Sequence, residues 1–189
     1  MDDNNVKKYD AYYLSGEECF RYNDEETELK ILDMWRWYFS DLFDIKAVVA
    51  EYMVSKALGF TKPYNTGYWT AHRIEYRERI IDLRAATYIR SMRYKRAEGN
   101  MVRHIDIRAK DGDIYVFCIN TGKTDIEADP LNLNNWRFYI IPVWYLENEC
   151  EKNRSISLTK VQRLVKDVDI MEFKEYIDNL IDNMNSGNE

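Results

Sequence analysis

The feature that most constrains the fold is a helix followed by a charged hairpin. Residues 47–58, AVVAEYMVSKAL, place apolar side chains along one helical face, and Gly59 ends the helix. Two stretches rich in β-branched and aromatic residues follow at 68–76 and 79–88, separated by a charged two-residue turn. This order predicts a helix that packs against an antiparallel pair of strands.

Further strands and helices are predicted around this unit. Asp111-Gly112 is a hairpin turn signal, and the apolar run after it, 113–119, is typical of a buried central strand. A helix expected at 27–43 takes Thr27 as its N-cap. The other elements expected are strands at 102–108 and 136–143 and helices at 144–149, 157–164 and 168–184. The order of elements predicts the α+β class, with a mixed sheet flanked by helices.

The length of 189 residues favours one domain, and the scarcity of Gly and Pro argues against internal disorder. We expect an N-terminal arm at 1–26, a core at 27–166, and a C-terminal helix and tail at 167–189. No run of about 18 apolar residues and no apolar signal core is found, so we expect a cytoplasmic protein with no membrane partner. Three widely spaced cysteines argue against disulfides and zinc.

Charge is distributed unevenly along the chain. The net charge is −6, yet residues 73–110 hold eleven Lys or Arg against five acids, so this stretch carries +6 and the remainder −12. Such segregation predicts one basic face that binds nucleic acid; scattered, solvated side chains on strand surfaces are the alternative. The candidate nucleic-acid-binding residues are Arg73, Arg90, Arg93, Lys95 and Arg96.

Several sequence blocks resemble a family of uncharacterised bacterial proteins that is similar to the PD-(D/E)XK, or restriction-endonuclease-like, superfamily. The likeness spans about residues 33–165 and is densest in VAEYMVSKALG and PLNLNNWRFYIIP, with IIDLRAATYIRSM between them. It implies a restriction-endonuclease-like mixed central sheet flanked by helices. It also implies a Mg-dependent nuclease site, in which a helix supplies one acid and the hairpin supplies an acid-x-base triplet.

The site residues implied by the resemblance match this chain only in part. Glu51 matches the helix acid and Asp82 the acid of the triplet, whereas Arg84 stands where lysine is expected. Arg73 stands where the first strand would supply an aspartate, and the nearest acid on that strand is Glu75. The residues of the scaffold match, and most of those that would carry the reaction do not.

These replacements change the expected chemistry. Phosphodiester hydrolysis of this kind needs Mg²⁺ held by carboxylates and a cation near the attacking water. At about 5 Å and an effective dielectric constant of about 20, Arg73 would repel a divalent ion by roughly 6–7 kcal/mol. Arg84 keeps the positive charge of the expected lysine but cannot act as a base. We therefore expect no resident cofactor; in an active enzyme, Asp82 and Glu75 would hold Mg²⁺ or Mn²⁺.

Three functions are consistent with these residues. The first is a catalytically degenerate nuclease-fold protein that binds DNA, another nucleic acid or a protein partner. The second is an active Mg²⁺/Mn²⁺-dependent DNA endonuclease that uses Glu51, Glu75, Asp82 and Arg84. The third is a structural or regulatory protein-interaction domain. A simple salt bridge within Asp82-Leu83-Arg84 is the structural alternative to a site, since these side chains share one strand face.

Overall fold

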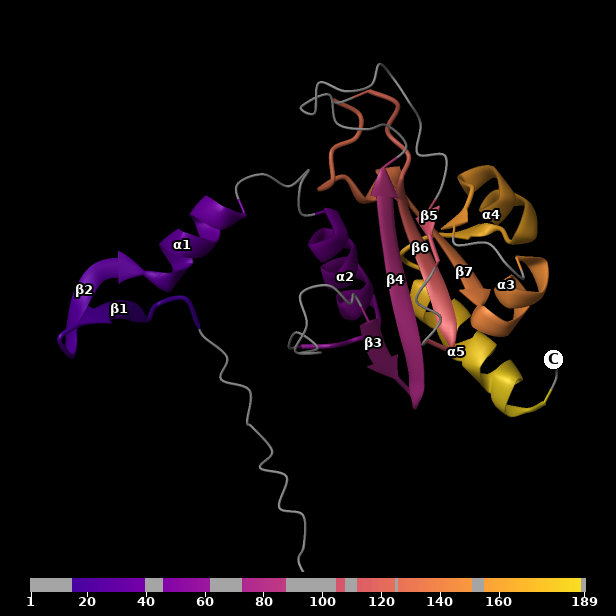
Figure 1. Cartoon of the computed structure of the whole chain (residues 1–189), viewed down its shortest axis with the longest axis horizontal. Coiled ribbons are helices and arrows are strands. Elements are labelled where there is room, and N and C mark those ends of the chain that lie inside the picture. Colours follow the sequence, from indigo (N-terminus) through magenta and orange to yellow (C-terminus); the bar gives the residue numbers. More distant parts are fainter. Residues whose placement is uncertain are drawn as a thin grey trace, which may run out of the picture. The chain divides into compact units, whose positions relative to one another are not determined.

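The computed structural model describes residues 15–39, 46–61, 73–87, 105–107, 112–124, 126–150 and 155–187. Contacts between Cα atoms divide the chain into two units, unit 1 (Met1–Asp41) and unit 2 (Leu42–Glu189). Figure 1 shows the elements of each unit along the chain. No helix among the described residues combines the length and apolar character that crossing a membrane requires.

Unit 1 holds a β-hairpin followed by a short helix. Strands β1 (Cys19–Tyr22) and β2 (Glu25–Lys30) pair antiparallel, and α1 (Ile31–Tyr38) follows at once. The predicted helix start at Thr27 is wrong, because Thr27 lies in β2 and its hydroxyl donates to the Phe20 carbonyl at 2.8 Å. Asn23 and Asp24, with φ of 51° and 63°, close the hairpin in a conformation that these residue types tolerate well.

Unit 2 is built on a mixed sheet of five strands. In spatial order these are β3 (Arg73–Tyr76), β4 (Arg79–Thr87), β6 (Ile114–Asn120), β7 (Trp136–Pro142) and β9 (Asp167–Val168). Strands β4 and β6 are parallel, and the other neighbouring pairs are antiparallel. A parallel pair cannot be joined by a tight turn, so the chain crosses over between β4 and β6.

Each face of the sheet carries its own hydrophobic core. On the first face, α2 (Lys46–Ala57) and α5 (Phe173–Asn185) cover residues such as Ile81 and Val116. On the second face, α3 (Val143–Glu149) and α4 (Leu158–Leu164) pack over residues such as Phe117 and Ile141. Alternation of side chains along each strand separates the two cores. Figure 1 shows the strands between α2 and the pair formed by α3 and α4.

Several predictions about unit 2 are confirmed. The helix expected at 47–58 is α2, and Gly59 follows it with a φ of 89°. The turn between β3 and β4 is formed by Arg77 and Glu78, both with positive φ. The strand expected at the centre is β6, in which every residue is buried. The α+β class with a mixed, helix-flanked sheet is therefore confirmed.

One predicted hairpin is wrong. The turn at 111–112 was expected to join the strand at 102–108 to the central strand. Instead, β5 (Ile105–Asp106) pairs with β8 (Ser155–Ile156) in a separate two-stranded sheet. The reason is that β4 and β7 already occupy both edges of β6, so no edge is left for β5.

The remaining helices follow the predictions with shifted ends. The helices expected at 144–149 and 157–164 correspond to α3 and α4, and the Ser157 hydroxyl caps α4 by accepting from the Lys160 N–H at 3.2 Å. The terminal helix expected from residue 168 begins at Phe173, because Asp167–Val168 form β9. A 3₁₀ helix, η1 (Leu133–Asn135), precedes β7.

Candidate functional site

Asp82 is a buried carboxylate on β4, with only 2% of the residue exposed. It lies on the second face of the sheet, between Arg73 on β3 and Tyr115 on β6, which are its partners in the two strand ladders. Its neighbours in sequence, Ile81 and Leu83, point into the core of the first face. Strand alternation thus explains why one acid in the apolar middle of β4 faces a different environment from its neighbours.

Two guanidinium groups contact the same oxygen of Asp82. Arg84 Nη2 donates to Asp82 Oδ2 at 2.8 Å, and Arg73 Nε lies 3.8 Å from that oxygen. Both arginine side chains are about a quarter exposed, 24% and 26%, whereas the carboxylate is almost fully covered. We call Arg73, Asp82, Arg84 and Tyr115 the Asp82 cluster. Its fixed charges sum to +1, because two arginines face one carboxylate.

Tyr115 completes the cluster from β6. The Arg84 guanidinium carbon lies 5.8 Å from the centre of the tyrosine ring, within the range of a cation–π contact. The phenol donates a hydrogen bond to the Ile107 carbonyl at 3.3 Å. Burial and the negative charge of Asp82 raise the pKa of Tyr115, so the phenol stays protonated at neutral pH. Tyr115 is therefore suited to positioning Arg84 and not to acting as a base.

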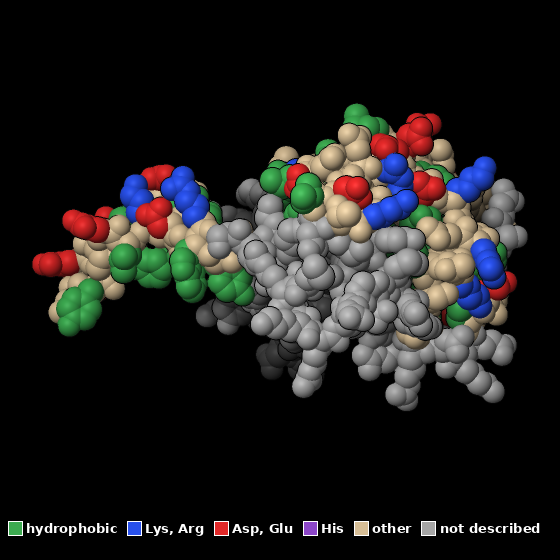
Figure 2. Space-filling model, turned by 90° about the horizontal axis from the view of Figure 1, so that it is seen from above, with side chains coloured by type: hydrophobic (Ala, Val, Ile, Leu, Met, Phe, Trp, Pro, Cys, Tyr) green, Lys and Arg blue, Asp and Glu red, His purple; other side chains and the backbone are tan. Residues whose placement is uncertain are grey.

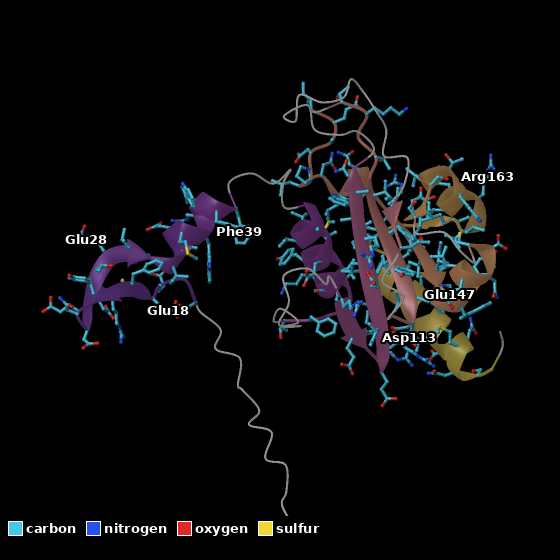
Figure 3. The ribbon with its side chains drawn as sticks, in the orientation of Figure 1. Glu18, Glu28, Phe39, Asp113, Glu147 and Arg163 are labelled. Carbon is cyan, nitrogen blue, oxygen red and sulfur yellow. The ribbon has the colours of Figure 1, made fainter. Side chains whose placement is uncertain are left out.

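The space next to Tyr115 is small. A cavity of about 10 Å³ is lined by Ile107, Tyr115, Leu146, Glu147 and Cys150. Glu147 comes from α3 and is labelled in Figure 3. This volume admits about one water molecule, far less than the several hundred Å³ of a typical small-molecule site. The cavity is therefore a packing defect of the second core and not a substrate pocket.

The acids expected to act together are spread over the structure. Glu51 belongs to α2, which packs on the first face of the sheet. Asp82 lies on the second face, so the sheet lies between α2 and the Asp82 carboxylate. Glu75 lies on the same face of β3 as Arg73 and is exposed. Within the described ranges, no group of three or more His, Cys, Asp or Glu is placed to hold a metal ion.

The described part of the basic stretch is paired with acids. Four of its eleven basic residues lie in β3, β4 and the turn between them, and each has a carboxylate oxygen within 3.8 Å. The pairs are Arg73–Asp82, Arg84–Asp82, Arg77–Asp178, Arg77–Asp182 and Arg79–Asp113. Asp113, labelled in Figure 3, also accepts from the Ile80 N–H at 2.8 Å. The predicted binding residues Arg90, Arg93, Lys95 and Arg96 lie outside the described residues.

Comparisons with known proteins add no family. No protein-family model matches this chain, and neither curated proteins nor solved structures give a significant match.

Tyr115 was not predicted to be part of the site. Its position in a predicted central strand was the only available signal, since an aromatic residue there is most often part of the core. Tyr115 lies opposite Asp82 because β4 and β6 pair in parallel, although the two residues are about thirty positions apart in the sequence. A long crossover connects the two strands, so no local sequence pattern indicates which residues lie opposite each other. The pairing of Asp113 with Arg79 on β4 was not predicted for the same reason.

Proposed function

We propose that this protein has a restriction-endonuclease-like core with a degenerate metal site, and that it binds nucleic acid without cleaving it. The observation that carries this proposal is the double contact at Asp82 Oδ2, where Arg84 and Arg73 approach the same oxygen. A nuclease of this kind would use that carboxylate to bind a divalent ion. Here guanidinium groups compensate the charge that would otherwise attract the ion.

Electrostatics favours this arrangement over a metal site. An ion at Asp82 would displace or face two fixed positive charges, neither of which can be removed by deprotonation. The acids that would complete its ligand set, Glu51 and Glu75, do not converge on Asp82: the first lies on a helix of the opposite face and the second is exposed. Of these three acids, only Asp82 is in the expected position, where the chemistry commonly uses two carboxylates.

Nucleic-acid binding rests on the segment 88–104 and not on the cluster. This segment holds five basic residues and one acid, Glu98, and includes the candidates Arg90, Arg93, Lys95 and Arg96. The described arginines of β3 and β4 are paired with acids, so their charge is largely compensated. Phosphate contacts of lysine and arginine make binding strongly dependent on salt.

A cleavage assay tests the catalytic part of the proposal. We expect supercoiled and linear DNA to remain intact after incubation with Mg²⁺ or Mn²⁺. Cleavage that Asp82→Ala abolishes would overturn the degenerate site and support an active endonuclease using Glu51, Glu75 and Asp82. Cleavage that survives Asp82→Ala would indicate a contaminating nuclease, and the assay would be repeated after further purification.

A salt titration tests the binding part. We expect the logarithm of the DNA affinity to fall linearly with the logarithm of salt concentration. Combined Arg93→Gln, Lys95→Gln and Arg96→Gln substitutions should weaken binding and lower the slope by up to about 0.9 per lost phosphate contact. The matched control removes three exposed cations elsewhere, Lys123, Arg163 and Lys166, by the same substitutions. Equal effects of both variants would contradict a binding site in this segment.

A protein-interaction role is the second candidate, and a separate observation favours it. Unit 1 exposes large hydrophobic side chains from both its hairpin and its helix, among them Tyr22 and Trp37. Exposed apolar patches of this kind mark interaction sites more often than they mark ordinary surface. This role does not exclude nucleic-acid binding by unit 2.

A further inference from the structure

Unit 1 exposes an unusual amount of hydrophobic surface. Six of its large apolar side chains are at least 40% exposed, with Trp37 at 78% and Tyr22 at 74%. Figure 2 shows hydrophobic side chains gathered along one side of unit 1, with charged side chains mainly on the other. We call this surface the apolar face of unit 1; its residues are Phe20, Tyr22, Leu29, Met34, Trp37 and Tyr38.

The hairpin and the helix contribute to this face together. Phe20 and Leu29 from the hairpin and Met34 from α1 line one hollow of about 330 Å³, whose other lining residues are the charged Glu28, Lys30 and Asp33. Tyr22 lies two residues after Phe20 on β1, and Trp37 and Tyr38 lie three and four residues after Met34 on α1. These spacings bring side chains to the same side of a strand and of a helix. The face is therefore continuous across both elements.

Unit 1 has almost no core of its own. Gly16 is the one buried residue among positions 15–39, where Leu32 and Trp35 of α1 lie against it. A two-stranded hairpin with one short helix is marginally stable in water, and units below about 40 residues rarely fold without further support. The apolar face therefore needs a partner surface to remove it from water.

We propose that the partner is the apolar face of a second copy of this chain, in a twofold-symmetric dimer. Residues 15–39 hold seven acids and three bases, so charged surfaces of two copies would repel each other. The charged side chains of unit 1 pair with one another, in Arg21–Glu26, Lys30–Glu17 and Arg36–Asp33, and none of the six residues of the apolar face takes part in these pairs. Contact between two apolar faces buries hydrophobic surface on both copies and leaves the acidic surfaces in solvent.

The area of the face suits such a dimer. At roughly 200 Å² per large side chain, the six residues together expose about 700 Å². A stable interface of standard size buries about 800 Å² on each partner. Four of the six residues are aromatic, the type that is enriched in the centre of interfaces. A twofold interface uses the same patch on both copies, so no second surface is required.

Sedimentation of the full chain tests the proposal. We expect a species of twice the 22.7 kDa chain mass at micromolar concentration, dissociating on dilution. Leu29→Glu with Trp37→Glu should convert it to a monomer, because the paired face would then bury four carboxylates. Glu26→Gln with Arg36→Gln, outside the face, is the matched control and should leave the dimer intact.

The other outcomes overturn the proposal. A monomer at all concentrations would mean that no second copy covers the face, and a dimer unaffected by the Leu29 and Trp37 substitutions would place the interface elsewhere. Thermal unfolding of unit 2, followed by near-ultraviolet circular dichroism, verifies that each variant is folded. The dimer is independent of nucleic-acid binding, so DNA affinity measured with the monomeric variant separates failure of one proposal from failure of the other.

Discussion

Asp82 lies in a buried environment that would destabilise an unpaired negative charge. A carboxylate at 2% exposure loses most of its hydration, and only close cations and hydrogen bonds compensate for that loss. Arg84 supplies a charged hydrogen bond at 2.8 Å, and Arg73 adds a second positive charge at 3.8 Å. Arg84 Nε, however, is buried without a hydrogen-bond partner in the described part of the chain. The negative charge of Asp82 is thus compensated, but the hydrogen-bond donors of Arg84 are not all satisfied.

Asp82→Ala should lower the free energy of unfolding by about 3 kcal/mol, because the two guanidinium groups lose the charge that compensates them. Replacing all three residues with apolar ones, by Arg73→Met, Asp82→Leu and Arg84→Met, should restore most of that loss. Glu75→Gln on the exposed surface is the control, with an expected change within about 0.5 kcal/mol. Urea denaturation measures all three, and an Asp82→Ala variant as stable as the parent would show that the cluster does not form.

Gly122 is required for a different reason, the close approach of two backbone segments. A Cβ atom at this position would lie 2.3 Å from the Ala128 nitrogen, which is itself held by a hydrogen bond to the Thr124 carbonyl at 2.8 Å. The buried Asn120 fixes the same loop by accepting from the Gly122 N–H at 3.1 Å. The loop between β6 and β7 therefore requires a residue without a side chain at position 122.

Gly122→Ala should cost about 3 kcal/mol or more, since the backbone of the loop must move to admit one methyl group. Gly59→Ala is the comparison: Gly59 has a φ of 89° but no atom within 4 Å of a Cβ, so only the conformational strain of about 1 kcal/mol applies. Equal shifts of the denaturation midpoint for the two variants would contradict a steric role for Gly122.

At the scale of elements, α5 is attached to the β3–β4 turn by polar contacts as well as by its apolar side. Asp178 accepts from the Tyr76 hydroxyl at 2.9 Å and from Arg77 Nη1 at 3.3 Å. Burial alone would raise the pKa of Asp178, but hydrogen bonds from Lys174 and Tyr76 outweigh it, so the pKa lies below its ordinary 3.8. The ionised form is therefore the one that the folded protein stabilises.

Asp178→Ala should lower stability by about 1–2 kcal/mol at neutral pH. The contribution of Asp178 is fully present above the ordinary carboxyl pKa and is lost as pH falls below 3.8, so the difference between variant and parent should shrink in acid. Asp182→Ala, at an ion pair whose carboxylate is 60% exposed, should cost only a few tenths of a kcal/mol. A difference that grows in acid would contradict this assignment of charge.

At the scale of the whole molecule, the two units differ in the size of their hydrophobic cores. In unit 2, β6 is buried along its full length and is hydrogen-bonded on both edges, by β4 and β7. In unit 1, no residue of the hairpin or of α1 is buried. Such a contrast predicts that the two units open with different free energies, so one unfolding transition does not describe the chain.

Hydrogen exchange should separate the two units directly. Amides of Ile114–Asn120 should exchange only through global unfolding of unit 2, whereas amides of β1 and β2 should exchange far faster in dilute, monomeric protein. If the proposed dimer forms, exchange of β1 and β2 should slow as protein concentration rises, and exchange of β6 should not. Equal protection of β1 and β6 at low concentration would contradict the division into units.

How much of the fold was predictable depends on the range of the interactions. The turn at Arg77-Glu78 and the end of α2 at Gly59 depend on neighbouring residues, and the sequence predicted both. The pairing of β5 with β8 brings together residues about fifty positions apart, and no local pattern distinguishes it from a hairpin with β6. In unit 1, one helix was expected at 27–43, whereas pairing with β1 holds Glu25–Lys30 in strand β2, and the helix begins only at Ile31.

The candidate site shows the same division. The sequence by itself determined that Asp82 and Arg84 share one strand face, because side chains alternate along any strand. Only the tertiary structure decided that Arg73 and Tyr115 complete the cluster and that Glu51 lies on the opposite face. The physical reason is that alternation and helical period are properties of the local backbone, whereas strand order and the face that a helix covers follow from packing the whole chain.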